Sequence, residues 1–203
     1  PRETRFRELL RLRNPRASIQ DLTPILDELR SVKSPREIAL VRRASQLAGL
    51  GVLEAMRSTE PGAWEYQLDA VARFVFLQNG ARLDGYRSIT ASGTDNIWNG
   101  HYYRNDSQLR DGDLVLMDYA PDYRYYVSDI GRMWPVGGTY APWQRELLQL
   151  VLEWRNAILP RIRPGVTTDA ILAEARAAME PVLARRRFSK PEYEKAARKM
   201  LET

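Results

Sequence analysis

The spacing of hydrophobic residues changes twice along the chain. Apolar residues recur at helical spacing over residues 34–79, follow strand-like patterns over about 86–136, and return to helical spacing over 142–202. No short-period repeat accompanies these changes. Helices, a small group of strands and further helices, in that order, are typical of the α+β class. We therefore expect helices packed on a small antiparallel sheet.

The first long helix has a well-marked start. Ser34-Pro35-Arg36-Glu37 combines a Ser at the N-cap, a Pro at the first helical position and a Glu placed for a capping box. The helix should continue to about Arg57, before Glu60-Pro61-Gly62 ends it. On or near its buried face we expect Ile38, Val41, Ala48 and Leu53.

Further helices follow from the same periodicity. A helix over about 64–79 should be capped by Asn79-Gly80. Three more are expected over about 142–159, 168–185 and 191–202, and a short helical stripe covers residues 22–29. The expected buried residues of the helix over 64–79 are Tyr66, Leu68, Val71, Phe74 and Val75.

Between the helices, the pattern indicates three strands. Tyr86–Ala91 is expected to form the first, with a loop over Ser92–Asn99 behind it. Leu114–Met117 is a continuous apolar run, which predicts a strand that is buried on both faces. Tyr123–Val136 is expected to form the third strand.

Composition excludes several classes of function. The 203 residues are 44% hydrophobic and contain no Cys, which rules out disulfides, thiol nucleophiles and Cys-ligated zinc. No apolar run approaches the ~18 residues that span a bilayer. The net charge of +5 comes from Arg and Lys residues on predicted helices, so solvated helix faces explain it better than nucleic-acid binding. We expect neither a nucleic-acid nor a membrane partner.

Two aspartates in the strand region point to chemistry. Asp118 ends the apolar run and Asp129 lies within the next predicted strand, where unpaired carboxylates are costly to bury. A turn at Tyr123-Arg124 would place them opposite each other, with Cβ atoms ~5 Å apart, as ligands of a divalent cation. A turn at Pro121-Asp122 would separate them, and a surface hairpin with two unrelated aspartates is the third possibility. We prefer the first register because it gives both acids a common partner.

Several motifs together resemble one known family. The lead-in Ser34–Ile38, the segment Ile89–Gly93 followed by His101, and Tyr126–Arg132 around Asp129 are similar to pita-bread metallopeptidases. This family includes aminopeptidase P, prolidase, creatinase and methionine aminopeptidase, and the resemblance is closest to the first two. It implies an incomplete pita-bread fold, with residues 1–33 as a linker and leading helix from another domain, and 34–203 as the N-terminal portion of the catalytic domain.

The resemblance also implies roles for three residues. Asp118 would chelate one metal ion, Asp129 would bridge two, and His101 would donate a hydrogen bond to the scissile carbonyl without being a ligand. The implied activity removes the N-terminal residue from peptides with proline in second position. A prolidase acting on Xaa-Pro dipeptides and a non-catalytic peptide-binding protein remain alternatives. The implied metal is manganese, with cobalt, iron or zinc possible, and the implied assembly is a cytoplasmic homodimer.

The sequence departs from the family pattern in ways that matter. The segment from Gly93 to His101 is about one residue longer than usual, Gly131 stands where Thr is common, and Tyr125 where Gly is common. The family also takes a His and two Glu ligands from the second half of its fold, and this chain ends at Thr203. We therefore expect the chain by itself to bind metal weakly and to be inactive.

Overall fold

The computed structural model describes residues 2–202, so Pro1 and Thr203 lie outside it. The order of helices, strands and helices is the predicted one, and the α+β class is confirmed. The helices are α1 (Arg2–Arg13), α2 (Thr23–Ser31), α3 (Pro35–Arg57), α4 (Glu65–Gln78), α5 (Gly93–Ile97), α6 (Pro142–Ile158), α7 (Thr168–Arg185) and α8 (Pro191–Glu202), with a 3₁₀ turn at Leu159–Arg161. The strands are β1 (Leu83–Asp84), β2 (Ile89–Ser92), β3 (Leu114–Tyr119), β4 (Pro121–Asp122) and β5 (Ile130–Pro135).

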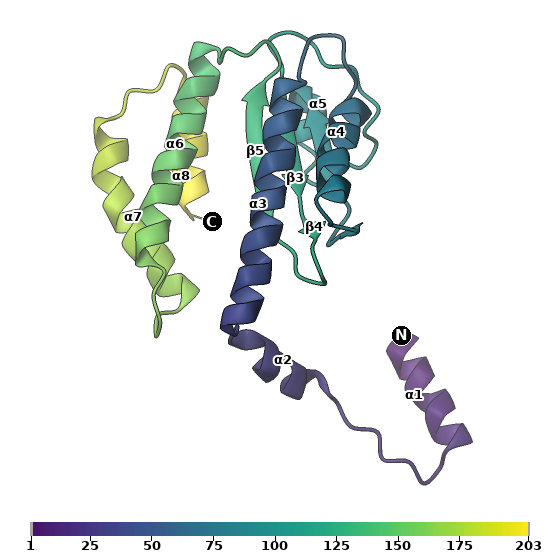
Figure 1. Cartoon of the computed structure of the whole chain (residues 1–203). Coiled ribbons are helices and arrows are strands. Elements are labelled where there is room, and N and C mark those ends of the chain that lie inside the picture. The colour runs from purple at the N-terminus through teal and green to yellow at the C-terminus, as the bar shows by residue number, and fades with distance from the viewer. Residues whose placement is uncertain (1, 203) are drawn as a thin grey trace.

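An antiparallel sheet in the order β2-β3-β5 forms the centre of the molecule, with α3 and α4 beside it (Figure 1). Strand β3 alternates strictly between buried and half-buried residues. Val115, Met117 and Tyr119 belong to the buried core that also includes residues of α3 and α4. The other face of β3 is therefore more open, and the prediction that this strand is buried on both faces is wrong.

Helix α3 begins as predicted. Ser34 Oγ accepts a hydrogen bond from the Glu37 backbone N–H at 3.3 Å, and Glu37 Oε2 accepts one from the Ser34 N–H at 2.6 Å. This reciprocal pair satisfies two backbone donors that the first helical turn leaves free. The capping box and the helix end at Arg57 are both confirmed.

The predicted buried faces of α3 and α4 are partly wrong. Ile38 and Leu53 of α3 are 46% and 50% exposed, and Tyr66 and Phe74 of α4 are 50% and 65% exposed. Most of the buried residues of α3 are Ala or Gly, and several bulkier apolar residues of both helices lie outside the buried faces. The residues that are buried are Ala44, Leu47, Ala48, Gly51, Val52 and Ala55 in α3, and Glu65, Leu68, Ala72 and Phe76 in α4.

The strand boundaries also differ from the prediction. Strand β2 begins at Ile89 rather than Tyr86, and residues predicted as a loop form helix α5. The long strand expected over 123–136 is reduced to β5, because the residues before Ile130 form the hairpin connection and its tip.

The hairpin between β3 and β5 has neither of the two registers considered from the sequence. Asp118 is opposite Gly131, and Tyr123 pairs with Tyr126. The tip is Arg124-Tyr125, whose φ angles of 55° and 70° are both positive, as in the hairpin turns whose twist matches that of the flanking strands. The Asp122 carboxylate accepts a hydrogen bond from the Tyr125 N–H at 2.7 Å, which stabilises this turn despite the lack of Gly or Asn.

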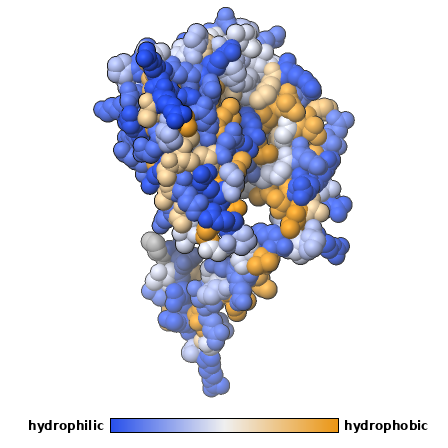
Figure 2. Space-filling view, turned by 90° about the vertical axis from the view of Figure 1, so that its left-hand side faces the viewer, coloured by the Kyte–Doolittle hydropathy of each residue, from blue (hydrophilic) through white to orange (hydrophobic). Residues whose placement is uncertain are grey.

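The two ends of the chain pack differently. Helices α6, α7 and α8, all near their predicted bounds, share a second core around Leu150, Met179 and Leu183. Helices α1 and α2 contain no buried residue, and α1 lies apart from the sheet at the end of an extended segment (Figure 1). Apolar patches interrupt the mostly hydrophilic face in Figure 2. Within residues 2–202, no helix is both long and apolar enough to cross a membrane.

Candidate active site

The open face of β3 carries Asp118. Leu116, two residues earlier on the same face, packs against Ile89, Ala91 and Tyr102. Asp118 is opposite Ile89 in the ladder with β2, and its side chain is half-buried. A carboxylate is therefore placed at the end of a strand, beside apolar neighbours, with access to solvent.

Asp118 and Asp129 meet at a third side chain. The Tyr86 hydroxyl lies within hydrogen-bonding distance of Asp118 Oδ1 and is 3.0 Å from Asp129 Oδ1. Asp129 directly precedes β5 and is two residues from Gly131, the partner of Asp118, so the two carboxylates approach diagonally rather than directly across the ladder. The predicted proximity is present, but Asp129 is exposed and outside the strand, contrary to the prediction that it is a buried strand residue.

The chemistry of this pair suits a hard divalent cation. One hydroxyl proton can be donated to only one of the two carboxylates at a time. None of the ion pairs found among residues 2–202 includes Asp118 or Asp129, so their negative charges converge without a cationic side chain. Carboxylate oxygens are preferred ligands of such cations. Within the same residues, no group of three or more His, Cys, Asp or Glu side chains is arranged to hold a metal ion.

Tyr86 is a site residue that the sequence reasoning missed. Burial, reinforced by the adjacent carboxylates of Asp118 and then Asp129, raises the pKa of its hydroxyl well above the usual range. The hydroxyl therefore stays protonated and acts as a donor to the pair. Its only signal in the sequence was its position at the start of a predicted strand, 32 residues before Asp118.

His101 lies on an exposed loop after α5. Its ring is edge-on to that of Tyr103, with 6.3 Å between the ring centroids. Arg87 also contacts Tyr103: its guanidinium lies 4.7 Å from the Tyr103 ring centroid and donates to the Tyr103 carbonyl oxygen at 2.8 Å. The neighbouring Tyr102 packs on Ile89 and Ala91, the open-face residues of β2. The loop therefore packs on the face of the sheet that carries Asp118. The role of His101 stays a prediction.

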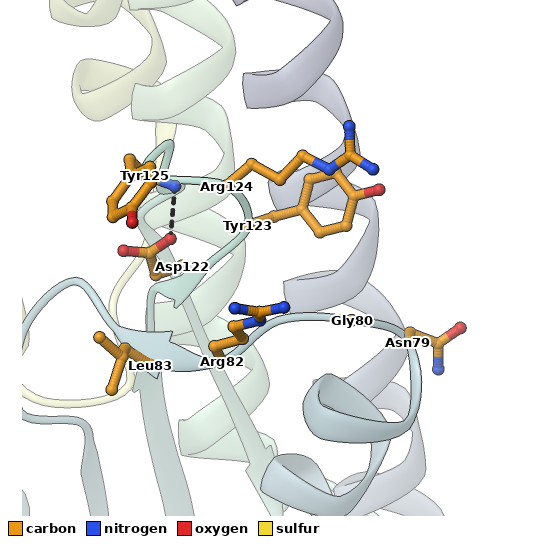
Figure 3. A pocket seen from close by; sticks show the side chains of 8 residues that line it. All are labelled: Asn79, Gly80, Arg82, Leu83, Asp122, Tyr123, Arg124 and Tyr125. Carbon is orange, nitrogen blue, oxygen red and sulfur yellow. Dashed lines mark hydrogen bonds between the residues drawn. The ribbon is translucent and has the colours of Figure 1, made fainter.

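A separate hollow of about 830 Å³ lies at the hairpin tip (Figure 3). It is lined by residues between the end of α4 and the start of β1, including Arg82 and Leu83, and by Asp122 to Tyr125. Neither His101 nor the Asp118–Asp129 pair contributes to it. This hollow is therefore distinct from the candidate site.

Comparison with known proteins agrees with these features. The model of metallopeptidase family M24 matches residues 39–196. The chain is 38% identical over 158 residues to the Xaa-Pro aminopeptidase of Escherichia coli (strain K12), and 39% identical over 149 residues to that of Haemophilus influenzae. These alignments cover 78% and 73% of this chain, but only 36% and 34% of the two relatives.

Solved structures show the same relationship. Proline aminopeptidase P II from Yersinia pestis superimposes with a TM-score of 0.80 at 35% identity, over 96% of this chain and 46% of that one. A zinc-substituted Escherichia coli aminopeptidase P in complex with product gives a TM-score of 0.78 at 34% identity, over 91% and 42% of the two chains. The architecture is therefore part of the pita-bread fold of aminopeptidase P. The chain belongs to metallopeptidase family M24, and it spans about a third of the length of the curated relatives described above.

Proposed function

We propose that the protein carrying this chain is a metal-dependent Xaa-Pro aminopeptidase, in which Asp118 and Asp129 are metal ligands and His101 acts on the substrate. The observation that carries the proposal is the convergence of the Asp118 and Asp129 carboxylates on the Tyr86 hydroxyl, with no ion pair to either carboxylate among residues 2–202. The relatives that are named as Xaa-Pro aminopeptidases support the choice of substrate class.

Each residue of the site has a distinct proposed task. Asp118 and Asp129 would hold divalent metal, with manganese the best match to carboxylate ligands. When bound, the metal supplies Lewis-acid activation of water and of the scissile carbonyl. His101 donates a hydrogen bond to the oxygen on which charge develops. The Tyr86 hydroxyl orients the two carboxylates by donating to the pair.

The proposal extends to the organisation of the protein. Residues 1–33 would serve as a linker and leading helix, and 34–203 as the N-terminal portion of the catalytic domain. The complete protein would act as a cytoplasmic homodimer. The 203-residue chain by itself would bind metal weakly and lack activity, because two carboxylates and water hold hard cations less firmly than a full ligand set.

The substrate role of His101 can be tested in the complete protein that carries this chain. His101→Ala should lower kcat on an Xaa-Pro-Yaa peptide by about 10²–10³-fold, because it removes a hydrogen bond to developing charge. The metal content should be unchanged. Asp122→Asn is a matched control, since Asn can still accept the hydrogen bond from Tyr125 at the hairpin tip. Unchanged turnover in His101→Ala, or cleavage of Xaa-Pro dipeptides alone, would contradict the proposal.

A further inference from the structure

Glu65, the first residue of α4, is a fully buried acid with an unusual set of contacts. Its Oε1 accepts hydrogen bonds from Ser92 N at 2.6 Å, Ser92 Oγ at 2.8 Å and Asn96 Nδ2 at 3.1 Å. Its Oε2 accepts from the Tyr102 hydroxyl at 2.7 Å and from Ser107 N at 3.1 Å. A buried carboxylate is tolerated only when its oxygens are hydrogen-bonded, as they are here. Its negative charge is also stabilised by its position in the first turn of a helix.

The five donors belong to one segment, residues 92–107, and lie on both sides of His101. Ser92 and Asn96 belong to the end of β2 and to α5, before the candidate substrate residue His101. Tyr102 and Ser107 follow it. Between them the backbone turns at Asn105, whose φ of 60° is rare for a residue other than Gly. The Glu65 carboxylate thus accepts hydrogen bonds from residues on both sides of His101.

These contacts require a carboxylate rather than an amide. Two of the donors are backbone N–H groups, which cannot reverse their role, and each binds a different oxygen of Glu65. In Glu65→Gln, whichever way the amide is oriented, its NH₂ group faces one of these N–H groups. A buried donor would lose its acceptor, and the segment would have to move to restore hydrogen bonding.

We propose that Glu65 is a positioning residue for His101: it fixes the 92–107 segment so that the imidazole is held over the open face of the sheet. Glu65 does not touch the substrate in this proposal. The inference rests on the proposed function, because His101 is the residue through which Glu65 would act.

A double-mutant cycle in the complete, metal-loaded protein tests the coupling. Glu65→Gln should lower kcat by about 10–100-fold, as expected for a misplaced catalytic group, with KM and metal content little changed. In the His101→Ala background the same substitution should lower kcat by less than about 2-fold, because the group that it positions is gone. An equal loss in both backgrounds would overturn the proposal. A His101→Ala variant with full kcat would instead contradict the proposed function itself.

A second readout does not depend on activity. His101 is the only histidine of the 203-residue chain, so its Hε1 proton gives a single resonance in the NMR spectrum of that chain. Glu65→Gln should shift or broaden this resonance. Asp69→Asn is the matched control, since Asp69 is one turn further along α4 and accepts from Ser88, Arg73 and Tyr119 but not from the 92–107 segment. Equal resonance changes in the two variants would contradict a specific role for Glu65.

If Glu65→Gln does not fold, Tyr102→Phe takes its place in both experiments. This substitution keeps the ring packed against Ile89 and Ala91 and removes the hydroxyl, which donates to Glu65 Oε2 and also lies 3.2 Å from Asp106 Oδ1 and 3.3 Å from Ser107 Oγ. Its effects on kcat and on the His101 resonance should be smaller and in the same direction. A Tyr102→Phe variant with wild-type values for both would overturn the proposal.

Discussion

Two glycines of α3 should respond in opposite ways to the same substitution. A Cβ at Gly51 would lie 2.3 Å from Phe76 Cε1 and 2.8 Å from Cζ, whereas a Cβ at Gly49 would meet nothing within 4 Å. The Phe76 ring is 2% exposed and its centroid is 5.8 Å from that of Tyr119, so it cannot simply swing aside. Gly51→Ala therefore forces the α3–α4 contact apart.

The magnitudes follow from two opposing terms. Replacing Gly by Ala inside a helix is worth about 1 kcal/mol, which should stabilise Gly49→Ala by about 0.5–1 kcal/mol. At Gly51 the same gain is offset by overpacking, which typically costs about 1–3 kcal/mol and more when a rigid ring is in the way. We expect Gly51→Ala to be less stable than wild type by about 1–2 kcal/mol.

Urea unfolding of the 203-residue chain measures the difference directly. With an unchanged dependence on denaturant, the midpoint of Gly49→Ala should rise and that of Gly51→Ala should fall. A domain of this size should lose about 2–4 °C in Tm for each kcal/mol. A Gly51→Ala variant as stable as wild type, or equal shifts in both variants, would refute the close packing of α3 on Phe76.

Two further predictions concern the start of α3 and the chain by itself. The hydrogen bonds from Ser34 and Tyr126 lower the pKa of Glu37 from 4.5 to about 2, so its contribution to stability is present above pH 4.5 and is lost as the pH falls toward 2. Glu37→Gln should therefore be less stable than wild type near pH 7. Between pH 4.5 and 2 the variant should lose less stability than wild type does. Urea midpoints that fall by the same amount in both proteins across that range would contradict this. The 203-residue chain, loaded with manganese, should not hydrolyse an Xaa-Pro-Yaa peptide. Turnover comparable to that of the complete protein would show that the chain already contains a sufficient site.

The parts of the fold that could be predicted are those with local causes. The start of α3 is set by Ser34 and Glu37, which contact each other three residues apart. The hairpin register could not be read locally, because Arg124-Tyr125 adopts positive φ angles without Gly, supported by a contact from Asp122. The buried face of α3 was misjudged because most of its residues are Ala or Gly, which a pattern of larger apolar residues does not identify.

Some residues of the candidate site could likewise be predicted from the sequence and others could not. Asp118 and Asp129 could be singled out because carboxylates in apolar strand patterns are conspicuous, and the family resemblance assigned them a task. Tyr86 and Glu65 could not, because each acts through partners that are distant in sequence: Tyr86 contacts Asp118 and Asp129, and the donors to Glu65 begin at Ser92. Contacts of that kind are set by the assembled sheet and leave no pattern in the sequence.

The most direct test of the account is the affinity for Mn²⁺ of the complete protein and of three variants, measured by isothermal titration calorimetry. Asp118→Asn and Asp129→Asn should each weaken binding by at least about 10-fold, because each removes the negative charge of a proposed ligand. Asp122→Asn, in the same hairpin, should bind as tightly as wild type, since Asp122 lies at the turn, where it accepts a hydrogen bond from the Tyr125 N–H, and not at the candidate site. Full Mn²⁺ affinity in both Asp118→Asn and Asp129→Asn would contradict the claim that these two aspartates form part of the metal site.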